Sequence, residues 1–295
     1  MGRYQSGSGV VATTPDVSRA LYNLAVDERR AEIGGIEIFW REAAPTDGGA
    51  PVVYVHGVPT SSDDWLPFLK RTGGLALDLP GFGRSGKPSD FPYSIEGYAG
   101  FLDAWLSEAG VDRYRLVVHD WGAVGLALAE FAPERVERLV IVNAVPFLPG
   151  YHWHRVARVW RTPLAGEIFM GLTFQRNLRR GLAAGMPDGE VPDDFFDSIW
   201  SHFDHGTQRA ILKLYRSAPP DVLAAAGERL GTLTAPALVV WGTPEPYIPV
   251  EFAQRYADAL GGPARVEELP GARHWLWVGR PETVDLIADF LLETG

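Results

Sequence analysis

An aspartate occupies a position where a nucleophile would be presented to a substrate. The run Leu116-Val117-Val118-His119-Asp120-Trp121-Gly122-Ala123 is typical of a buried strand that enters a helix through a tight turn, with small residues where strand and helix approach each other. This pattern predicts a nucleophile elbow, in which serine usually occupies the apex. The chain contains no Gly-x-Ser-x-Gly motif, and Ser85 in its glycine-rich stretch lacks a preceding strand, which disfavours a serine esterase. The alternative role for Asp120 is an N-cap on the following helix.

Short apolar runs rich in β-branched residues alternate with helical patterns on both sides of this elbow. Strands are predicted at residues 52–55, 75–77, 116–118, 139–142 and 238–241, and the segments between them carry helical spacing. This alternation predicts an α/β fold with a mostly parallel, doubly wound sheet. A hairpin broken at Gly34-Gly35 is expected before the sheet, and an amphipathic helix over residues 281–292 is expected after it.

From about Pro146 to Gly231 the strand pattern gives way to helical stretches rich in Arg, Trp and Phe. Because the strand pattern resumes at Ala237, we interpret this segment as a helical cap inserted into one sheet. The expected core domain comprises residues 1–145 and 232–295, and the expected cap domain comprises residues 146–231. Such a cap would lie over the strand ends, where α/β sheets bind ligands.

Five short motifs, in order, resemble those of the α/β-hydrolase superfamily, specifically its epoxide hydrolase and haloalkane dehalogenase branches. They are His56-Gly57-Val58-Pro59, Asp78-Leu79-Pro80-Gly81-Phe82-Gly83, His119-Asp120-Trp121-Gly122, Trp241-Gly242-Thr243-Pro244-Glu245 and Arg273-His274-Trp275. The resemblance covers nearly the whole chain. It implies an α/β-hydrolase fold with an inserted helical cap, no cofactor or metal, and Asp120 as the nucleophile.

Chemistry and resemblance together suggest roles for these motifs. A carboxylate that attacks a saturated carbon forms an alkyl ester, which a water must then hydrolyse with a base beside it. We expect His274 to be that base and Glu245 to be the acid that accepts the other imidazole N–H. Some dehalogenases carry the acid after the preceding strand, but that position is Asn143, which cannot hold the charge.

The loop after residue 55 and the cap are expected to complete the site. In the resembling enzymes, backbone N–H groups equivalent to those of Val58 and Trp121 form the oxyanion hole. His56 is expected to brace this loop. The predicted substrate-binding residues are His56, Pro59, Trp121 and Trp153.

These motifs do not identify the leaving group, because epoxide hydrolysis and haloalkane dehalogenation both begin with attack by Asp120. Epoxide opening produces an alkoxide, and the resembling hydrolases protonate it with cap tyrosines; Tyr215 matches the second of these, and Tyr151 is the other tyrosine of the cap. Halide departure needs N–H donors, of which Trp121 is one. Val58 stands where many dehalogenases have asparagine, and its side chain cannot donate a hydrogen bond. One halide ligand is therefore missing unless Trp153, Trp160 or another cap residue substitutes.

Epoxide hydrolysis to a vicinal diol is therefore the favoured function, with haloalkane dehalogenation as the alternative. A fluoroacetate dehalogenase is disfavoured because Trp121 replaces the arginine that follows the nucleophile in those enzymes. A hydrolase-like ligand receptor without activity is the alternative outside enzymology. The histidine pairs 152/154 and 202/205 have no third metal ligand that the sequence identifies, and we expect them on a solvated face of the cap.

Composition restricts the partners and the compartment. The 295 residues include no cysteine, which excludes disulfides and thiolate catalysis, and the formal net charge of −10 disfavours nucleic acid and anionic lipid as partners. Neither a secretory signal nor an apolar run of roughly 18 residues is visible, so a cytoplasmic protein that does not span a membrane is expected. The expected ligand is a small hydrophobic substrate, and the expected assembly is a monomer or homodimer.

Overall fold

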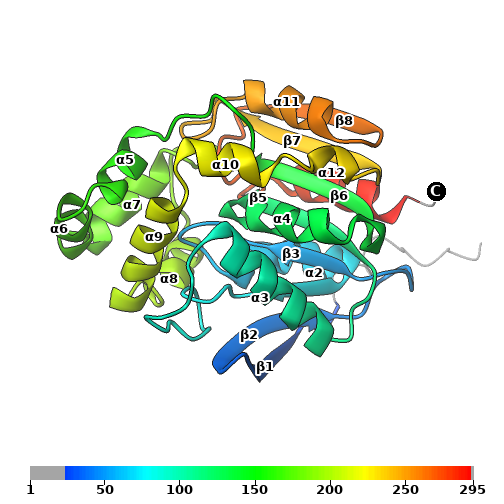
Figure 1. The fold of residues 1–295 in the computed structure, drawn as a ribbon, viewed down its shortest axis with the longest axis horizontal. Helices are drawn as coiled ribbons and strands as arrows, with labels where there is room; N and C mark the ends of the chain where they lie inside the picture. The colour runs from blue at the N-terminus through cyan, green and yellow to red at the C-terminus, as the bar shows by residue number, and fades with distance from the viewer. Residues whose placement is uncertain (1–23, 294–295) are drawn as a thin grey trace, which may run out of the picture.

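A single mixed sheet organises the chain. The computed structural model describes residues 24–293, so the first part of the predicted core domain, residues 1–23, lies outside the described residues. The sheet has eight strands in the order β1-β2-β4-β3-β5-β6-β7-β8 (Figure 1). They are β1 (Asp27–Ile33), β2 (Ile36–Ala43), β3 (Val52–Val55), β4 (Gly74–Leu77), β5 (Tyr114–Asp120), β6 (Val136–Ala144), β7 (Ala237–Thr243) and β8 (Ala264–Pro270).

The first two strands form the predicted hairpin, and β2 joins β4 antiparallel, whereas all the remaining pairs are parallel. Strands β3, β4 and β5 are buried along their whole length, which is why they are continuous apolar runs in the sequence. Strand β8 is an edge strand with mostly exposed residues, and its charged residues Arg265, Glu267 and Glu268 leave no apolar run in the sequence.

Helices cover both faces of the sheet, as the predicted doubly wound fold requires. One face packs against α3 (Ile95–Glu108), α4 (Val124–Phe131) and α11 (Glu251–Ala259), and the other packs against α2 (Leu66–Thr72) and α12 (Pro281–Leu292). Four short 3₁₀ helices lie in the connections: η1 (Ser62–Trp65), η2 (Trp121–Ala123), η3 (Pro133–Arg135) and η4 (Leu230–Thr232). The predicted α/β fold class is confirmed.

The segment between β6 and β7 is helical, as expected. It contains α5 (Arg155–Arg161), α6 (Ala165–Gly171), α7 (Gln175–Ala183), α8 (Asp193–Trp200), α9 (His205–Ser217) and α10 (Pro220–Ala226). In Figure 1, α5 to α9 lie together at the left, beyond one end of the sheet. The division into domains at residues 146 and 231 stays a prediction.

None of the helices in residues 24–293 is both long and apolar enough to cross a bilayer. The cytoplasmic location and the monomeric or homodimeric assembly stay predictions.

Candidate active site

The elbow at the end of β5 is sterically demanding. Asp120 has φ 50° and ψ −122°, a conformation that side chains rarely adopt and that is typical of strained functional turns. Two glycines make room for it. A Cβ on Gly122 would lie 2.1 Å from the Val55 carbonyl oxygen, and a Cβ on Gly57 would lie 2.4 Å from the Cβ of Asp120. The strand, the turn and the neighbouring loop therefore hold the Asp120 carboxylate in one place.

Backbone donors surround this carboxylate. The N–H of Val58 donates to Oδ1 of Asp120 at 2.8 Å, and the N–H of Trp121 also hydrogen-bonds to the carboxylate. Burial raises the pKa of Asp120, while His274 and these two N–H groups oppose the rise. His56 braces the loop as predicted, because its Nδ1 lies 2.7 Å from the Gly57 carbonyl oxygen and its Nε2 accepts from the N–H of Leu79.

His274 and Glu245 form a buried pair beside Asp120. Nδ1 of His274 lies 3.1 Å from Oε2 of Glu245, and Nε2 lies 3.8 Å from Oδ2 of Asp120. The Glu245 side chain is 0% exposed, and its Oε1 accepts from the N–H groups of Tyr247 and Ile248. Burial alone would lower the pKa of His274, but the charge and hydrogen bond of Glu245, together with Asp120, raise it. The three predicted side chains are thus brought together in the order that a nucleophile, base and acid require.

Asn143, at the end of β6, ties together the two loops that carry this pair. Its Nδ2 donates to the carbonyl oxygens of Arg273 and His274 at 2.6 and 2.8 Å, and its Oδ1 accepts from the N–H of Gly242 at 2.9 Å. The amide uses both donor and acceptor atoms. Asn143 therefore contributes to the position of His274.

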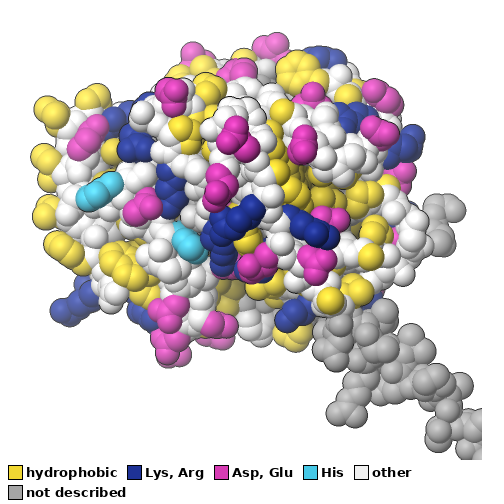
Figure 2. All heavy atoms as spheres, turned by 90° about the horizontal axis from the view of Figure 1, so that it is seen from below, with side chains coloured by type: hydrophobic (Ala, Val, Ile, Leu, Met, Phe, Trp, Pro, Cys, Tyr) yellow, Lys and Arg dark blue, Asp and Glu magenta, His cyan; other side chains and the backbone are white. Residues whose placement is uncertain are grey.

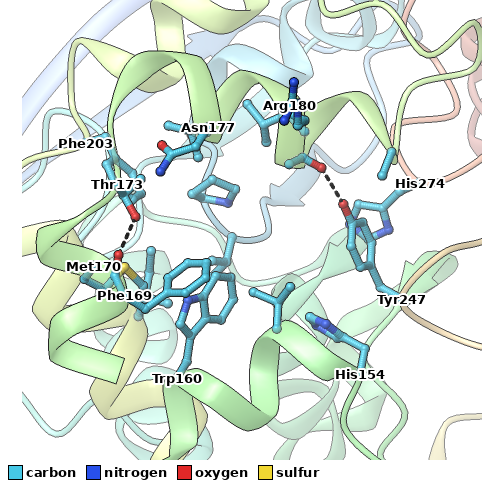
Figure 3. Close-up of a pocket in the computed structure, with 18 of the residues that line it drawn as sticks. His154, Trp160, Phe169, Met170, Thr173, Asn177, Arg180, Phe203, Tyr247 and His274 are labelled. Carbon is cyan, nitrogen blue, oxygen red and sulfur yellow. Dashed lines mark hydrogen bonds between the residues drawn. The ribbon is translucent and has the colours of Figure 1, made fainter. Parts of the chain in front are cut away.

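A cavity of about 420 Å³ is lined by both Asp120 and His274, and Figure 3 shows His274 among the residues around it. Its walls are mainly apolar and aromatic by area. The polar side chains that line it, besides two tyrosines, are Asp120, His154, Thr173, Asn177, Arg180 and His274. The lining includes Val58, Pro59, His154, Val156, Trp160, Phe169, Met170, Leu178, Phe203, Ile211, Tyr215, Tyr247 and Trp275. In the part of the chain that the structure describes, no cluster of three metal-ligating side chains is present.

The two predicted cap tyrosines differ in position. Tyr215 is buried and lines the cavity, and burial together with the charge of Asp120 raises its pKa well above the usual value. Tyr151 does not line the cavity, contrary to its predicted catalytic role. Its ring packs against Trp153 and Phe252, and its hydroxyl lies 3.5 Å from the Tyr247 carbonyl oxygen.

Two predicted substrate-binding tryptophans lie behind the cavity wall. Trp153 stacks on Trp121 with a centroid distance of 5.4 Å, and neither is among the lining residues. Trp153 is also unavailable as a halide ligand, because its indole N–H donates to the Ala218 carbonyl oxygen at 2.9 Å. The indole N–H of Trp121 is buried, and a hydrogen bond from the Trp121 side chain opposes the rise in the pKa of Tyr215. His56 does not line the cavity either, whereas Pro59 does.

His154 is a cavity residue that the sequence did not reveal. It was expected on a solvated face, but its ring lies in the cavity wall beside Tyr247, at a centroid distance of 5.1 Å, and edge-on to Tyr215 at 6.4 Å (Figure 3). Its Nδ1 accepts from the N–H of Ala157 as the N-cap of α5, so Nε2 carries the proton. Burial lowers the pKa of His154 to about 4, which keeps the ring neutral with one free N–H donor.

Asp64, in η1, is a second unforeseen feature. It is 5% exposed, and its Oδ2 has no hydrogen-bond partner among the described residues. Burial raises the pKa of Asp64 to about 8, and the charges of Asp63 and Asp120 act in the same direction. In the sequence Asp63-Asp64 resembles an ordinary exposed acidic pair, because only the tertiary packing buries the second carboxyl group.

Comparison with known proteins gives a consistent family assignment. The family model described as alpha/beta hydrolase fold matches residues 50–281. A haloalkane dehalogenase of Bradyrhizobium diazoefficiens is 30% identical over 270 residues, covering 80% of this chain and 85% of that protein. Epoxide hydrolase A of Mycobacterium tuberculosis is 27% identical over 317 residues, covering 90% and 98%. The crystal structure of haloalkane dehalogenase DbeA from Bradyrhizobium elkani superposes with a TM-score of 0.78 at 26% identity, covering 90% of this chain and 98% of that one.

Proposed function

We propose that this chain, which belongs to the α/β-hydrolase fold family, opens epoxides to vicinal diols through a covalent ester on Asp120. The chain is a hydrolase of that family, as the sequence predicted. Its relatives bear the names of two reactions that begin with the same attack, so the choice between them rests on the groups that face the leaving atom.

In the first step, the Asp120 carboxylate attacks an epoxide carbon and the ring C–O bond breaks. The ring oxygen takes a proton from the hydroxyl of Tyr215, while the neutral imidazole of His154 donates its Nε2 N–H to the same oxygen. Both groups suit this task, because a buried tyrosine with a raised pKa stays protonated and a histidine with a pKa of about 4 stays neutral. The products are the alkyl ester and a tyrosinate.

In the second step, His274 removes a proton from water and the resulting hydroxide attacks the ester carbonyl carbon. Negative charge develops on an oxygen of Asp120, where the N–H groups of Val58 and Trp121 can stabilise it. Collapse breaks the bond to the alkyl oxygen, which takes the proton from His274. The proton left on the Asp120 carboxyl returns to Tyr215 through solvent, which restores the enzyme.

One observation carries this proposal: Tyr215 and His154 line the same cavity as Asp120. An alkoxide is a far more basic leaving group than a halide, so proton donors at this position assist epoxide opening in particular. The apolar lining favours a hydrophobic epoxide over a charged one.

Haloalkane dehalogenation is the second candidate. It is supported by the indole N–H of Trp160, which lines the cavity and has no hydrogen-bond partner among the described residues, and by the names of the relatives. Against it stand the side chain of Val58, which cannot donate, and the indole N–H of Trp153, which is already used.

The test compares the wild-type chain with the variant Tyr215→Phe, on a panel of terminal and aryl epoxides and on a matched panel of haloalkanes. We expect diol formation by the wild type and an esterification step slowed about 100-fold in the variant, because one proton donor is lost. Tyr151→Phe is the matched control and should react like the wild type, since its hydroxyl does not line the cavity. Halide release by the wild type, equally fast in Tyr215→Phe and without diol formation, would establish the second candidate instead.

A further inference from the structure

The cap carries nearly all the exposed large hydrophobic side chains of the described chain. Seven such side chains are at least 36% exposed, and six of them lie between residues 156 and 174. We call these six the cap-tip patch: Val156, Leu164, Ile168, Phe169, Leu172 and Phe174. The seventh, Phe131, lies at the end of α4. Figure 2 shows hydrophobic side chains along the left edge of the molecule, the end at which Figure 1 places α6.

This exposure is not explained by packing within the cap. Leu164, Ile168, Leu172 and Phe174 are 59–76% exposed, and they follow one another through α6 and into the start of α7. Isolated apolar side chains are common on protein surfaces, but a concentration of large ones on one part of the surface is typical of an interaction site. Leu164 also adopts φ 66°, a left-handed conformation that is unfavourable for leucine.

The same helices are strongly basic within an acidic protein. Residues 155–180 contain six arginines and one glutamate, whereas the whole chain has a formal net charge of −10. The glutamate, Glu167, is paired with Arg216 of α9. Among the residues described, none forms an ion pair with the four exposed arginines of α5 and α7, which are Arg155, Arg158, Arg176 and Arg180. The acidic net charge of the chain is thus unevenly distributed, and the local charge of these helices has the opposite sign and favours anionic lipid.

The cap-tip patch adjoins the active-site cavity. Val156 and Phe169 belong to the patch and also line the cavity. Arg180 lines it from α7, and Figure 3 shows Phe169 and Arg180 around the cavity. A surface that covered the patch would therefore lie next to the route by which an apolar molecule reaches Asp120.

We propose that the cap-tip patch docks on an anionic phospholipid surface. The apolar side chains enter the boundary between headgroups and acyl chains, and the unpaired arginines contact the phosphates. The cavity then faces the bilayer, so that a hydrophobic molecule dissolved in lipid can reach it without crossing water. A second copy of the chain is a less favourable partner for the patch, because a two-fold contact would bring the same unpaired arginines of both copies together and their charges would repel.

The experiment measures binding of the full chain to vesicles by flotation, with phosphatidylcholine alone or mixed with phosphatidylglycerol. We expect binding to the mixed vesicles that weakens as salt is added, and much weaker binding to phosphatidylcholine alone. Ile168→Ser/Leu172→Ser and Arg155→Gln/Arg176→Gln should each weaken partitioning to the mixed vesicles about thirtyfold. Phe131→Ser is the matched control, since it removes an equally exposed hydrophobic side chain away from the cap, and it should bind like the wild type.

Three outcomes would overturn the proposal. They are no binding to the mixed vesicles, equal binding to both vesicle types, and equal loss of binding in Phe131→Ser and in the patch variants. Sedimentation without lipid tests whether a second copy of the chain covers the patch instead. If the chain forms a dimer that the patch variants abolish, and does not bind vesicles, the patch serves self-association. The readout is binding, so it does not depend on which bond the enzyme hydrolyses.

Discussion

The pairing of Glu245 with His274 makes a sharp kinetic prediction for Glu245→Gln. The glutamine oxygen can still accept from the N–H groups of Tyr247 and Ile248, so the loop should keep its shape while the charge is removed. Ester hydrolysis turns His274 into an imidazolium, which the Glu245 carboxylate stabilises at an N···O distance of 3.1 Å in a site without solvent exposure.

The expected size of the effect follows from this geometry. Two unit charges about 4 Å apart interact by about 4 kcal/mol at an effective dielectric constant of about 20. Losing that stabilisation in the transition state slows ester hydrolysis about 1000-fold. Formation of the ester does not protonate His274, so we expect that step to change less than about tenfold.

Single-turnover kinetics that follow ester formation and decay by quenched-flow mass spectrometry separate the two steps. Hydrolysis needs neutral His274, so its rate rises as the pH rises through the pKa of that residue. Because Glu245 raises this pKa, the variant should show the rising limb at lower pH than the wild type. Glu251→Gln, the same change at an exposed position of α11, serves as the control. Ester decay at the wild-type rate in Glu245→Gln, or equal loss of both steps, would refute the assignment of Glu245.

Two further predictions concern the residues that the sequence did not reveal. The native pKa of Asp64, about 8, lies above its unfolded value near 4, so the native state binds more protons between these values and the wild type loses stability as the pH rises through this window. Asp64→Asn removes this pH dependence. The free energy of unfolding of the variant, relative to that of the wild type, should increase by up to about 5 kcal/mol from pH 4 to pH 8, which urea unfolding at several pH values will measure. A difference in unfolding free energy that stays constant with pH would contradict the buried neutral carboxyl group. His154→Asn keeps a good N-cap for α5 but withdraws the donor from the cavity, so the thermal unfolding midpoint should hardly change while esterification by an epoxide slows about tenfold. An unchanged esterification rate would remove His154 from the mechanism.

The sequence was most informative where the chain is buried on both faces. The strands around Asp120 are continuous apolar runs because helices cover both sides of the sheet, and the glycine at 122 is required where the elbow approaches Val55. Edge strand β8 lacked this signal, since charged residues interrupt its apolar ones.

Within the site, the residues near strand ends were placed well, whereas the cap residues other than Tyr215 were not. Asp120, Glu245 and His274 follow strands β5, β7 and β8, whose order in the sheet brings them together. The path of the chain after β6 decides which cap residues reach the cavity, and no local pattern encodes that path. His154 therefore lines the cavity where Tyr151 was expected, and Asp64 is buried only by tertiary packing.

The covalent ester on Asp120 is the central claim, and intact-protein mass spectrometry of His274→Ala tests it most directly. Without the base, the second step should stall, so incubation with a reactive epoxide should add the whole mass of the epoxide to the protein. The adduct should be absent from Asp120→Asn/His274→Ala. If the wild type turns over an epoxide while His274→Ala gains no mass, or if the double variant gains the same adduct, Asp120 is not the nucleophile.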